Sequence, residues 1–362
     1  MPPHDARKSI ADRARQVLAE RGGARLAIFA PEEEAPVDPA PAQFAKARRE
    51  IYAEPGVSVR FPYASLDAEV GRMVPGQLLF VMANTGQGKT TFLLDVMDRW
   101  AEAGVWIDYL GTEQEPNELI TKWACLRTDV HPGVAIGKEW DDHAEGFAWQ
   151  AKVDAEVERL AARFGDVVRF SDDKFINLRK IEQAAKDAEA NGAHVLIVDH
   201  VDRIDVGDRE PEYVALKKLI RRLKELARDH KLVMVVASQM NREARKADRL
   251  GAYRAPQLHQ MQGGGTKEQE ADVVLGLWRP IRQANEDETA EEYKKLLAAA
   301  SKGHVPASDI IEANTMAVVL LKHRIHGERD GNRCKLHVKH GRITDIPERD
   351  KHSTTYDGQR RI

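Results

Sequence analysis

The sequence predicts an α/β fold in which a doubly wound, mostly parallel sheet is flanked by helices. Three observations predict it. Short apolar runs, each long enough for one buried strand, alternate with longer segments whose apolar residues recur at helical spacing. A glycine-rich loop at residues 83–90 separates one such run from the helix that follows, and the run Val195–Val198 ends in an acid, Asp199. Successive strand–helix–strand units of this kind form parallel sheets with right-handed crossovers.

Elements are predicted in order along this pattern. Helices are expected over 116–128, 147–164, 178–191 and 211–229, besides the helix that follows the glycine-rich loop. Strands are expected at Leu78–Met82, Val105–Leu110, Val167–Phe170, His194–Asp199, Leu232–Ala237, Val273–Leu277 and Met316–Leu321. A charged helical insert at about 283–300 precedes the last of these strands, and Leu336–Val338 with Arg342–Thr344 indicate a terminal hairpin.

The N-terminal residues have a different character. A helical pattern between Asp5 and Glu20 is followed by an acidic, proline-containing stretch, Pro31–Pro41, and by a second short helix at Gln43–Tyr52. These segments hold too few apolar residues for a core of their own. The division expected is a helical arm and linker at 1–58, an α/β core at 59–345 and a polar tail at 346–362.

The composition excludes several classes of protein. Of 362 residues, 42% are hydrophobic and 31% charged, and no apolar run approaches the ~20 residues of a membrane span. The N-terminus lacks the apolar segment of a signal peptide, so we expect a cytoplasmic protein without membrane contact. Cys125 and Cys334 stand far apart, which argues against a disulfide framework or a zinc ribbon. A net charge of −3 gives no overall sign of nucleic-acid binding, although a local basic lining would permit it.

The glycine-rich loop has Walker A spacing, with Ala83 where the motif's first glycine stands. Gly86 and Gly88 let backbone N–H groups turn inward around phosphate oxygens, and the following helix adds its dipole. Lys89 then reaches the β- and γ-phosphates, while Thr90 and Asp199, as a Walker B acid, bind Mg²⁺. ATP and Mg²⁺ are therefore the expected cofactors. The nucleotide contacts expected are Ala83, Asn84, Thr85, Gly86, Gln87, Gly88, Lys89, Thr90 and Thr91.

Further segments resemble, in the same order, the ATPase domain of DnaB-type replicative helicases, which have the RecA-like P-loop fold. Leu110–Pro116 resembles the family's Ser-Leu-Glu-Met segment, and Val236–Arg242 resembles Ser-Gln-Leu-Asn-Arg. Gly263–Val273 is similar to Ser-Gly-x-Ile-Glu-Gln-Asp-Ala-Asp-Val, and Leu321–Arg324 stands where the family has Lys-x-Arg. The resemblance covers roughly residues 60–345. The chain departs from the pattern in three ways: the family's tyrosine after the Walker B acid is His200, the charged insert is unusual, and no separate helical N-terminal domain is expected.

The resemblance implies roles for particular side chains. Glu113 is the candidate general base for the attacking water, and Glu115 is its competitor. Gln239 would contact the γ-phosphate and couple hydrolysis to the loop that follows. Lys322 and Arg324 would act in trans on the nucleotide of a neighbouring subunit, as an arginine finger with a companion lysine. Such sharing implies a head-to-tail assembly, a ring of six subunits if the resemblance holds.

Contact with DNA is predicted from a basic segment between Met240 and Gln262. A basic loop lining a pore binds a phosphate backbone without sequence preference, so we expect single-stranded DNA as partner. A second candidate loop runs from Asp205 to Pro211. The candidate DNA-binding residues are Arg209, Arg242, Arg245, Lys246, Arg249 and Arg254.

The function predicted is that of an ATP-driven DNA helicase that translocates on single strands. Two alternatives stay open at this point: a recombination ATPase of the RecA or RadA kind that forms filaments on DNA, and a regulatory ATPase that acts on a protein. A primase or a loader is a possible further partner. His194 and His200 are interpreted as structural, and the pair His337 and His340 as exposed side chains without a metal.

Overall fold

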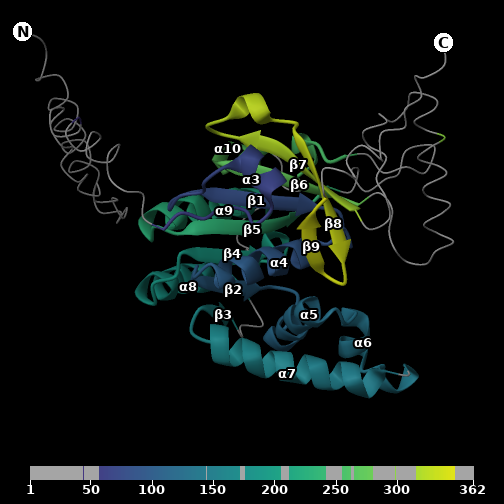
Figure 1. Ribbon diagram of the computed structural model, residues 1–362. Coiled ribbons are helices and arrows are strands. Elements are labelled where there is room, and N and C mark those ends of the chain that lie inside the picture. The colour runs from purple at the N-terminus through teal and green to yellow at the C-terminus, as the bar shows by residue number, and fades with distance from the viewer. Residues whose placement is uncertain are drawn as a thin grey trace, which may run out of the picture. The chain divides into compact units, whose positions relative to one another are not determined.

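A computed structural model describes residues 57–143, 145–171, 176–204, 212–241, 255–261, 265–279 and 315–346, together with Phe44 and Ala298 (Figure 1). The chain divides into two units, 1–54 and 55–362. Of the first unit the structure describes only Phe44, which is helical and exposed. The expectations for the arm, the charged insert and the tail therefore fall almost entirely outside the described residues.

The strands of the described residues form one sheet in the order β3-β2-β4-β5-β1-β6-β7-β8-β9 (Figure 1). Strands β1 to β6 pair in parallel, whereas β7, β8 and β9 are antiparallel. The bounds are β1 Leu78–Ala83, β2 Ile107–Gly111, β3 Val168–Phe170, β4 Val195–Asp199, β5 Val233–Gln239, β6 Val273–Trp278, β7 Thr315–His323, β8 Arg333–Lys339 and β9 Arg342–Asp345. The doubly wound, mostly parallel sheet predicted from the sequence is confirmed.

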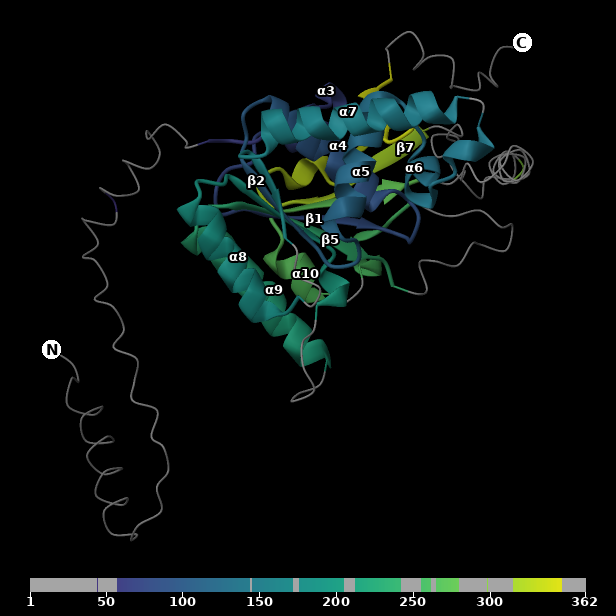
Figure 2. The ribbon, with the colours of Figure 1, turned by 90° about the horizontal axis from the view of Figure 1, so that it is seen from below.

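Helices cover both faces of the sheet (Figure 2). Helices α3, α4, α5 and α7 pack on one face, and α8, α9 and α10 lie on the other. Strand β1 shows the consequence, because Leu79 and Val81 belong to the first core and Phe80 and Met82 to the second. The bounds are α3 Ala64–Val70, α4 Lys89–Glu102, α5 Pro116–Thr128, α6 Pro132–Gly137, α7 Gly146–Phe164, α8 Leu178–Ala190, α9 Glu212–Asp229 and α10 Gly265–Glu270, with short 3₁₀ turns η1 Trp140–Asp142, η2 Val201–Arg203, η3 Leu258–Gln260 and η5 Gly327–Arg329.

Strand β7 is longer than its apolar run predicts. The run suggests an end at Leu321, but pairing with β6 continues to His323, which lies opposite Val273. A register shift between Val274 and Leu275 accompanies the extension. Lys322 therefore lies on the strand itself, and Arg324 follows its last residue. Hydrogen bonds along the strand, and not only apolar content, determine where it ends.

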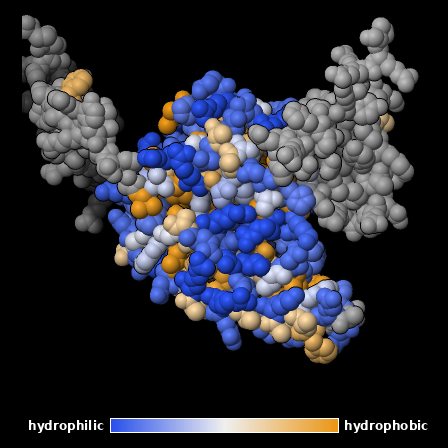
Figure 3. All heavy atoms as spheres, in the orientation of Figure 1, coloured by the Kyte–Doolittle hydropathy of each residue, from blue (hydrophilic) through white to orange (hydrophobic). Residues whose placement is uncertain are grey.

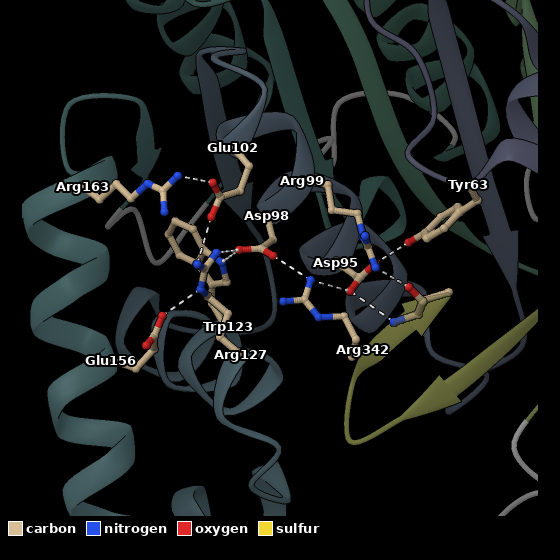
Figure 4. A network of polar contacts seen from close by, with 11 residues as sticks. Tyr63, Asp95, Asp98, Arg99, Glu102, Trp123, Arg127, Glu156, Arg163 and Arg342 are labelled. Atoms are coloured by element: carbon tan, nitrogen blue, oxygen red, sulfur yellow. Dashed lines mark hydrogen bonds and ion pairs between the residues drawn. The ribbon is translucent and has the colours of Figure 1, made fainter. Parts of the chain in front are cut away.

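Two buried carboxylates on α4 join this helix to the C-terminal hairpin and to α5 (Figure 4). Arg342 of β9 places Nη1 3.2 Å from Oδ1 of Asp95 and 2.7 Å from Oδ2 of Asp98. Arg127 of α5 donates from Nη1 to Asp98 at 2.6 Å, and the Tyr63 hydroxyl donates to Asp95 at 2.6 Å. Because α4 begins at the glycine-rich loop, this network fixes the helix that carries that loop.

Replacing Arg342 with methionine is expected to lower the free energy of unfolding by about 2 kcal/mol, because it removes hydrogen bonds to buried carboxylates. Burial alone would raise the pKa of Asp98, but hydrogen bonds from Trp123 and the two arginines outweigh it and lower the pKa. Urea unfolding at neutral pH measures the loss. The control is Lys339→Met, which removes an exposed pair with Asp129 and should change stability by less than about 0.5 kcal/mol. Equal losses in the two variants would contradict the network's role.

The surface in the view of Figure 3 is mostly hydrophilic, and apolar side chains gather at its lower edge, over α6 and α7. Ile136 of α6 is 39% exposed and Phe147 of α7 is 78% exposed. Among the helices of the described residues, none has the length and apolar character needed to cross a membrane.

Candidate active site

The phosphate-binding loop joins the end of β1 to the start of α4. Gly86 and Gly88 have φ angles of 74° and 92°, in the left-handed region that glycine adopts without strain. A Cβ on Gly88 would also lie 3.1 Å from Cε of Met316, so a larger residue would crowd the loop. Lys89, the first residue of α4, donates from Nζ to the carbonyl oxygen of Ala83 at 3.2 Å. The loop thus closes around its own lysine at the N-terminus of a helix, where anions bind.

The remaining loop residues follow from this geometry. Asn84 and Thr85 open the loop, and the carbonyl oxygen of Asn84 accepts the N–H of Gln87 at 3.2 Å. The side chain of Gln87 accepts the N–H of Arg279 at 2.6 Å, which ties the loop to the residue after β6. Thr91 lies in the first turn of α4. All the predicted nucleotide contacts therefore lie on one continuous turn.

Asp199, at the end of β4, lies beside Thr90. The Thr90 and Tyr109 hydroxyls both donate to Oδ2 of Asp199 at 2.7 Å. Burial, and then the charge of Asp199, raise the pKa of Tyr109 well above its usual value, so the phenol stays a donor. Threonine and carboxylate oxygens are ligands that Mg²⁺ accepts while keeping several waters, so the pair fits this ion. In the described part of the chain, no cluster of three or more His, Cys, Asp or Glu side chains could enclose a metal.

Glu113 and Gln239, predicted from separate motifs, meet at His200. Oε1 of Glu113 lies 3.1 Å from Nε2 of His200. Nε2 of Gln239 lies 3.1 Å from the same ring nitrogen. The three residues stand at the carboxyl ends of β2, β4 and β5, which are neighbours in the sheet, and β1 with its loop comes next. Thr112 reinforces the arrangement, because its Oγ1 accepts the N–H of His200 at 2.9 Å.

The structure distinguishes the two acids that the sequence left as alternatives. Glu113 places its carboxylate at His200. Glu115 precedes α5, and its carbonyl oxygen accepts the N–H groups of Glu118 at 3.0 Å and Leu119 at 3.1 Å. The geometry favours Glu113 as the acid that faces the phosphate loop's edge of the sheet, and its role as base stays a prediction.

A buried ion pair lies behind His200. Lys267 of α10 places Nζ 2.6 Å from Oδ1 of Asp202 and donates to Oγ of Ser238 at 2.8 Å. Burial alone would raise the pKa of Asp202, but His200 and Lys267 outweigh it and lower the pKa to about 2. Burial would lower the pKa of His200, but the carboxylates of Asp202 and Glu113 raise it. The carboxylate of Asp202 is therefore charged at neutral pH.

Sequence reasoning gave no function to this part of the site. His200 was interpreted as structural, yet the structure places it between two predicted site residues. Asp202 and Lys267 received no role. The signal was in the family pattern, because His200 stands in place of its tyrosine and Lys267 in place of its isoleucine. A lysine in an apolar motif position signals a buried partner.

Lys322 and Arg324 lie together at the C-terminal end of α10. The ammonium group of Lys322 donates to the carbonyl oxygen of Glu268. Arg324 donates from Nη2 to the carbonyl oxygen of Gln269 at 2.7 Å, and its Nη1 lies 3.2 Å from Oδ1 of Asp272. Cations are favourable at a helix C-terminus. Arg324 still exposes 39% of its side chain, so the pair lies where a neighbouring molecule can reach it.

The candidate DNA-binding residues Arg209, Arg242, Arg245, Lys246, Arg249 and Arg254 lie outside the described residues. The residues that flank the basic segment are described. Met240 forms a bridge with Met261, and the N–H of Asn241 donates to the carbonyl oxygen of Gln260 at 2.8 Å. The segment therefore leaves and rejoins the core directly beside Gln239.

The fold and the phosphate-binding loop define a RecA-like P-loop nucleotide-binding domain. Within that class, the model of the family "DnaB-like helicase C terminal domain" matches residues 56–339. The chain belongs to this family, which confirms the resemblance seen in the sequence.

Known relatives share this part of their length. The chain is 24% identical over 221 residues to a probable plasmid replicative DNA helicase of Chlamydia psittaci, covering 60% of this chain and 45% of that protein. It is 23% identical over 252 residues to the replicative DNA helicase DnaB of Leifsonia xyli subsp. xyli, covering 67% and 51%. The chain thus spans about half the length of the curated relatives it matches.

Solved structures share the fold. One of them, an isolated ATPase domain, superposes with a TM-score of 0.64 at 15% identity, covering 86% of this chain and 100% of that one. A DnaB-like replicative helicase, described with its interactions with primase, gives a TM-score of 0.63 at 15% identity, covering 93% and 71%.

Proposed function

We propose that this chain is the motor of an ATP-dependent DNA helicase, which couples ATP hydrolysis at subunit interfaces to translocation on single-stranded DNA and unwinding of the duplex. Membership of the DnaB-like helicase family supports this proposal over a recombination filament or a regulatory ATPase. The observation that carries it is the path of β5. This strand ends at Gln239, beside Glu113 and His200, and leads directly into the basic segment.

The chemistry follows from the placement of the side chains. The loop's N–H groups and Lys89 bind the β- and γ-phosphates, and Thr90 and Asp199 hold Mg²⁺. Bound Mg²⁺ stabilises the charge that develops on the phosphate oxygens. Glu113 orients the attacking water and accepts its proton. Gln239 contacts the γ-phosphate, so loss of that phosphate changes the constraints on the end of β5.

Catalysis is completed by a neighbouring subunit. Lys322 and Arg324 project from the end of β7 and act on the γ-phosphate held by the next subunit, in a ring of six. Their exposure at the end of α10 supports this role. A primase or a loader is a proposed partner, supported by the DnaB-like structural relative described with primase.

The DNA contact is proposed for the segment that rejoins β5 through the Met240–Met261 bridge. Its basic residues bind the phosphate backbone of single-stranded DNA, so affinity falls as the salt concentration rises. Because both ends of the segment are held beside Gln239, a change at the γ-phosphate is transmitted to the DNA contact.

The deciding experiment compares ATP hydrolysis with and without single-stranded DNA, followed by unwinding of a forked duplex. We expect stimulation that weakens with salt, and unwinding that requires ATP. Lys89→Ala is the inactive control, and the double variant Arg245→Glu/Arg249→Glu should abolish stimulation. Turnover indifferent to DNA would contradict a DNA motor and favour a protein partner. Stimulation without unwinding, with filaments in electron micrographs, would favour the recombination ATPase.

A further inference from the structure

The most deeply buried charges near the site belong to Lys267 and Asp202. Their side chains are 0% and 4% exposed, and Lys267 also lies over the Phe80 ring, with Nζ 6.0 Å from its centre. A buried ion pair loses so much solvation that well-packed apolar residues often replace it without loss of stability. Stability alone is therefore a weak explanation for this pair, and its other contacts show what it does.

Asp202 uses its second oxygen to hold two parts of the site. Oδ2 accepts the N–H of Gln239 at 2.6 Å and lies 3.5 Å from Nδ1 of His200. Lys267 fixes the first oxygen, so the plane of the carboxylate is set from α10. The imidazole of His200, itself 2% exposed, is thus confined between Asp202 on one side and Glu113 with Gln239 on the other.

We propose that the Asp202–Lys267 pair positions His200, so that Nε2 of the ring fixes the carboxylate of Glu113 and the carboxamide of Gln239 relative to each other. His200, Asp202 and Lys267 are then positioning residues for ATP hydrolysis. The proposal rests on the role of base proposed for Glu113. It extends that role by naming what holds the base, since a carboxylate 39% exposed has room to adopt other rotamers.

The first test replaces the pair as a unit. In Asp202→Leu/Lys267→Met neither partner remains as an unpaired buried charge, so the fold should survive with a similar melting temperature. We expect kcat for ATP to fall about a hundredfold, because misplacing a reacting group by about 1 Å has that effect, while KM stays within about threefold. The control Asp108→Leu/Arg169→Met removes a two-bond ion pair farther back on β2 and should keep wild-type turnover.

The second test asks for rescue at His200. A glutamine side chain places an amide nitrogen near the position of Nε2, so His200→Gln should retain at least about tenfold more turnover than His200→Ala. His194→Ala, at the opposite end of β4, is the matched control; there Nδ1 accepts the N–H of Trp106 at 3.0 Å. A purely structural role predicts that His200→Gln and His200→Ala lose turnover in step with their melting temperatures.

The outcomes separate this inference from the proposed function. Wild-type kcat in the double variant, or loss of turnover only in proportion to unfolding, would overturn the positioning role. If Glu113→Gln abolishes hydrolysis while the double variant does not, only the positioning role fails. If Glu113→Gln hydrolyses ATP normally, the assignment of the base fails and the positioning role fails with it.

Discussion

Replacing Arg324 with alanine is expected to reduce ATP turnover by about a thousandfold or more, the range over which trans arginine fingers act. In a single chain Arg324 contacts the carbonyl oxygen of Gln269 and the carboxylate of Asp272. It reaches a γ-phosphate only in an assembly, and there its charge stabilises the transition state. Nucleotide affinity should change little, because the P-loop of each subunit is intact. Steady-state hydrolysis and nucleotide titration measure the two effects separately.

Mixing two inactive variants tests whether the finger acts in trans. Arg324→Ala keeps an intact P-loop, and Lys89→Ala keeps an intact finger. An equal mixture should therefore restore wild-type sites at about a quarter of the interfaces in randomly assembled rings. Arg329→Ala is the control, since this arginine donates to the carbonyl oxygens of Ala68 and Glu69 and should hydrolyse ATP normally. A mixture with no recovery, or an active Arg324→Ala, would contradict the shared site.

The fold was predictable because parallel strands buried on both faces appear in a sequence as continuous apolar runs. The helix expected over 116–128 matches α5, and those expected over 147–164 and 178–191 differ from α7 and α8 by one residue at one end. The short helices α3, α6 and α10 were not predicted. Helices of six or seven residues leave little periodicity to detect, and tertiary contacts fix them.

The site was predictable only where one motif holds the whole interaction. The phosphate loop is local in sequence, so its residues could be named together. The contact between Glu113 and Gln239 was not foreseeable, because it passes through His200 on a third strand. The partnership of Asp202 with Lys267 spans 65 residues of sequence. Such pairs are set by the strand order, which alternation of strands and helices does not specify.

Replacing Glu113 with glutamine is expected to lower kcat for ATP by about a hundredfold to ten-thousandfold, the contribution of a positioned general base. Glutamine has the same shape and still accepts a hydrogen bond, but it cannot take the proton from water. Binding of ATP and Mg²⁺ should persist, because Lys89, Thr90 and Asp199 are untouched. A fluorescent nucleotide titration, beside single-turnover hydrolysis, would show tight binding with slow chemistry.

The matched control is Glu115→Gln, which makes the same chemical change two residues away. Glu115 precedes α5, where its backbone carbonyl begins the helix, and the substitution leaves that carbonyl in place. We expect its turnover to stay within about threefold of the wild type, because a change at an exposed acid outside the reacting groups has a small effect. The reverse ranking would transfer the base to Glu115. In that case the contact between Glu113 and His200 would serve to hold the loop after β2, and the geometry of attack would have to be derived from the start of α5.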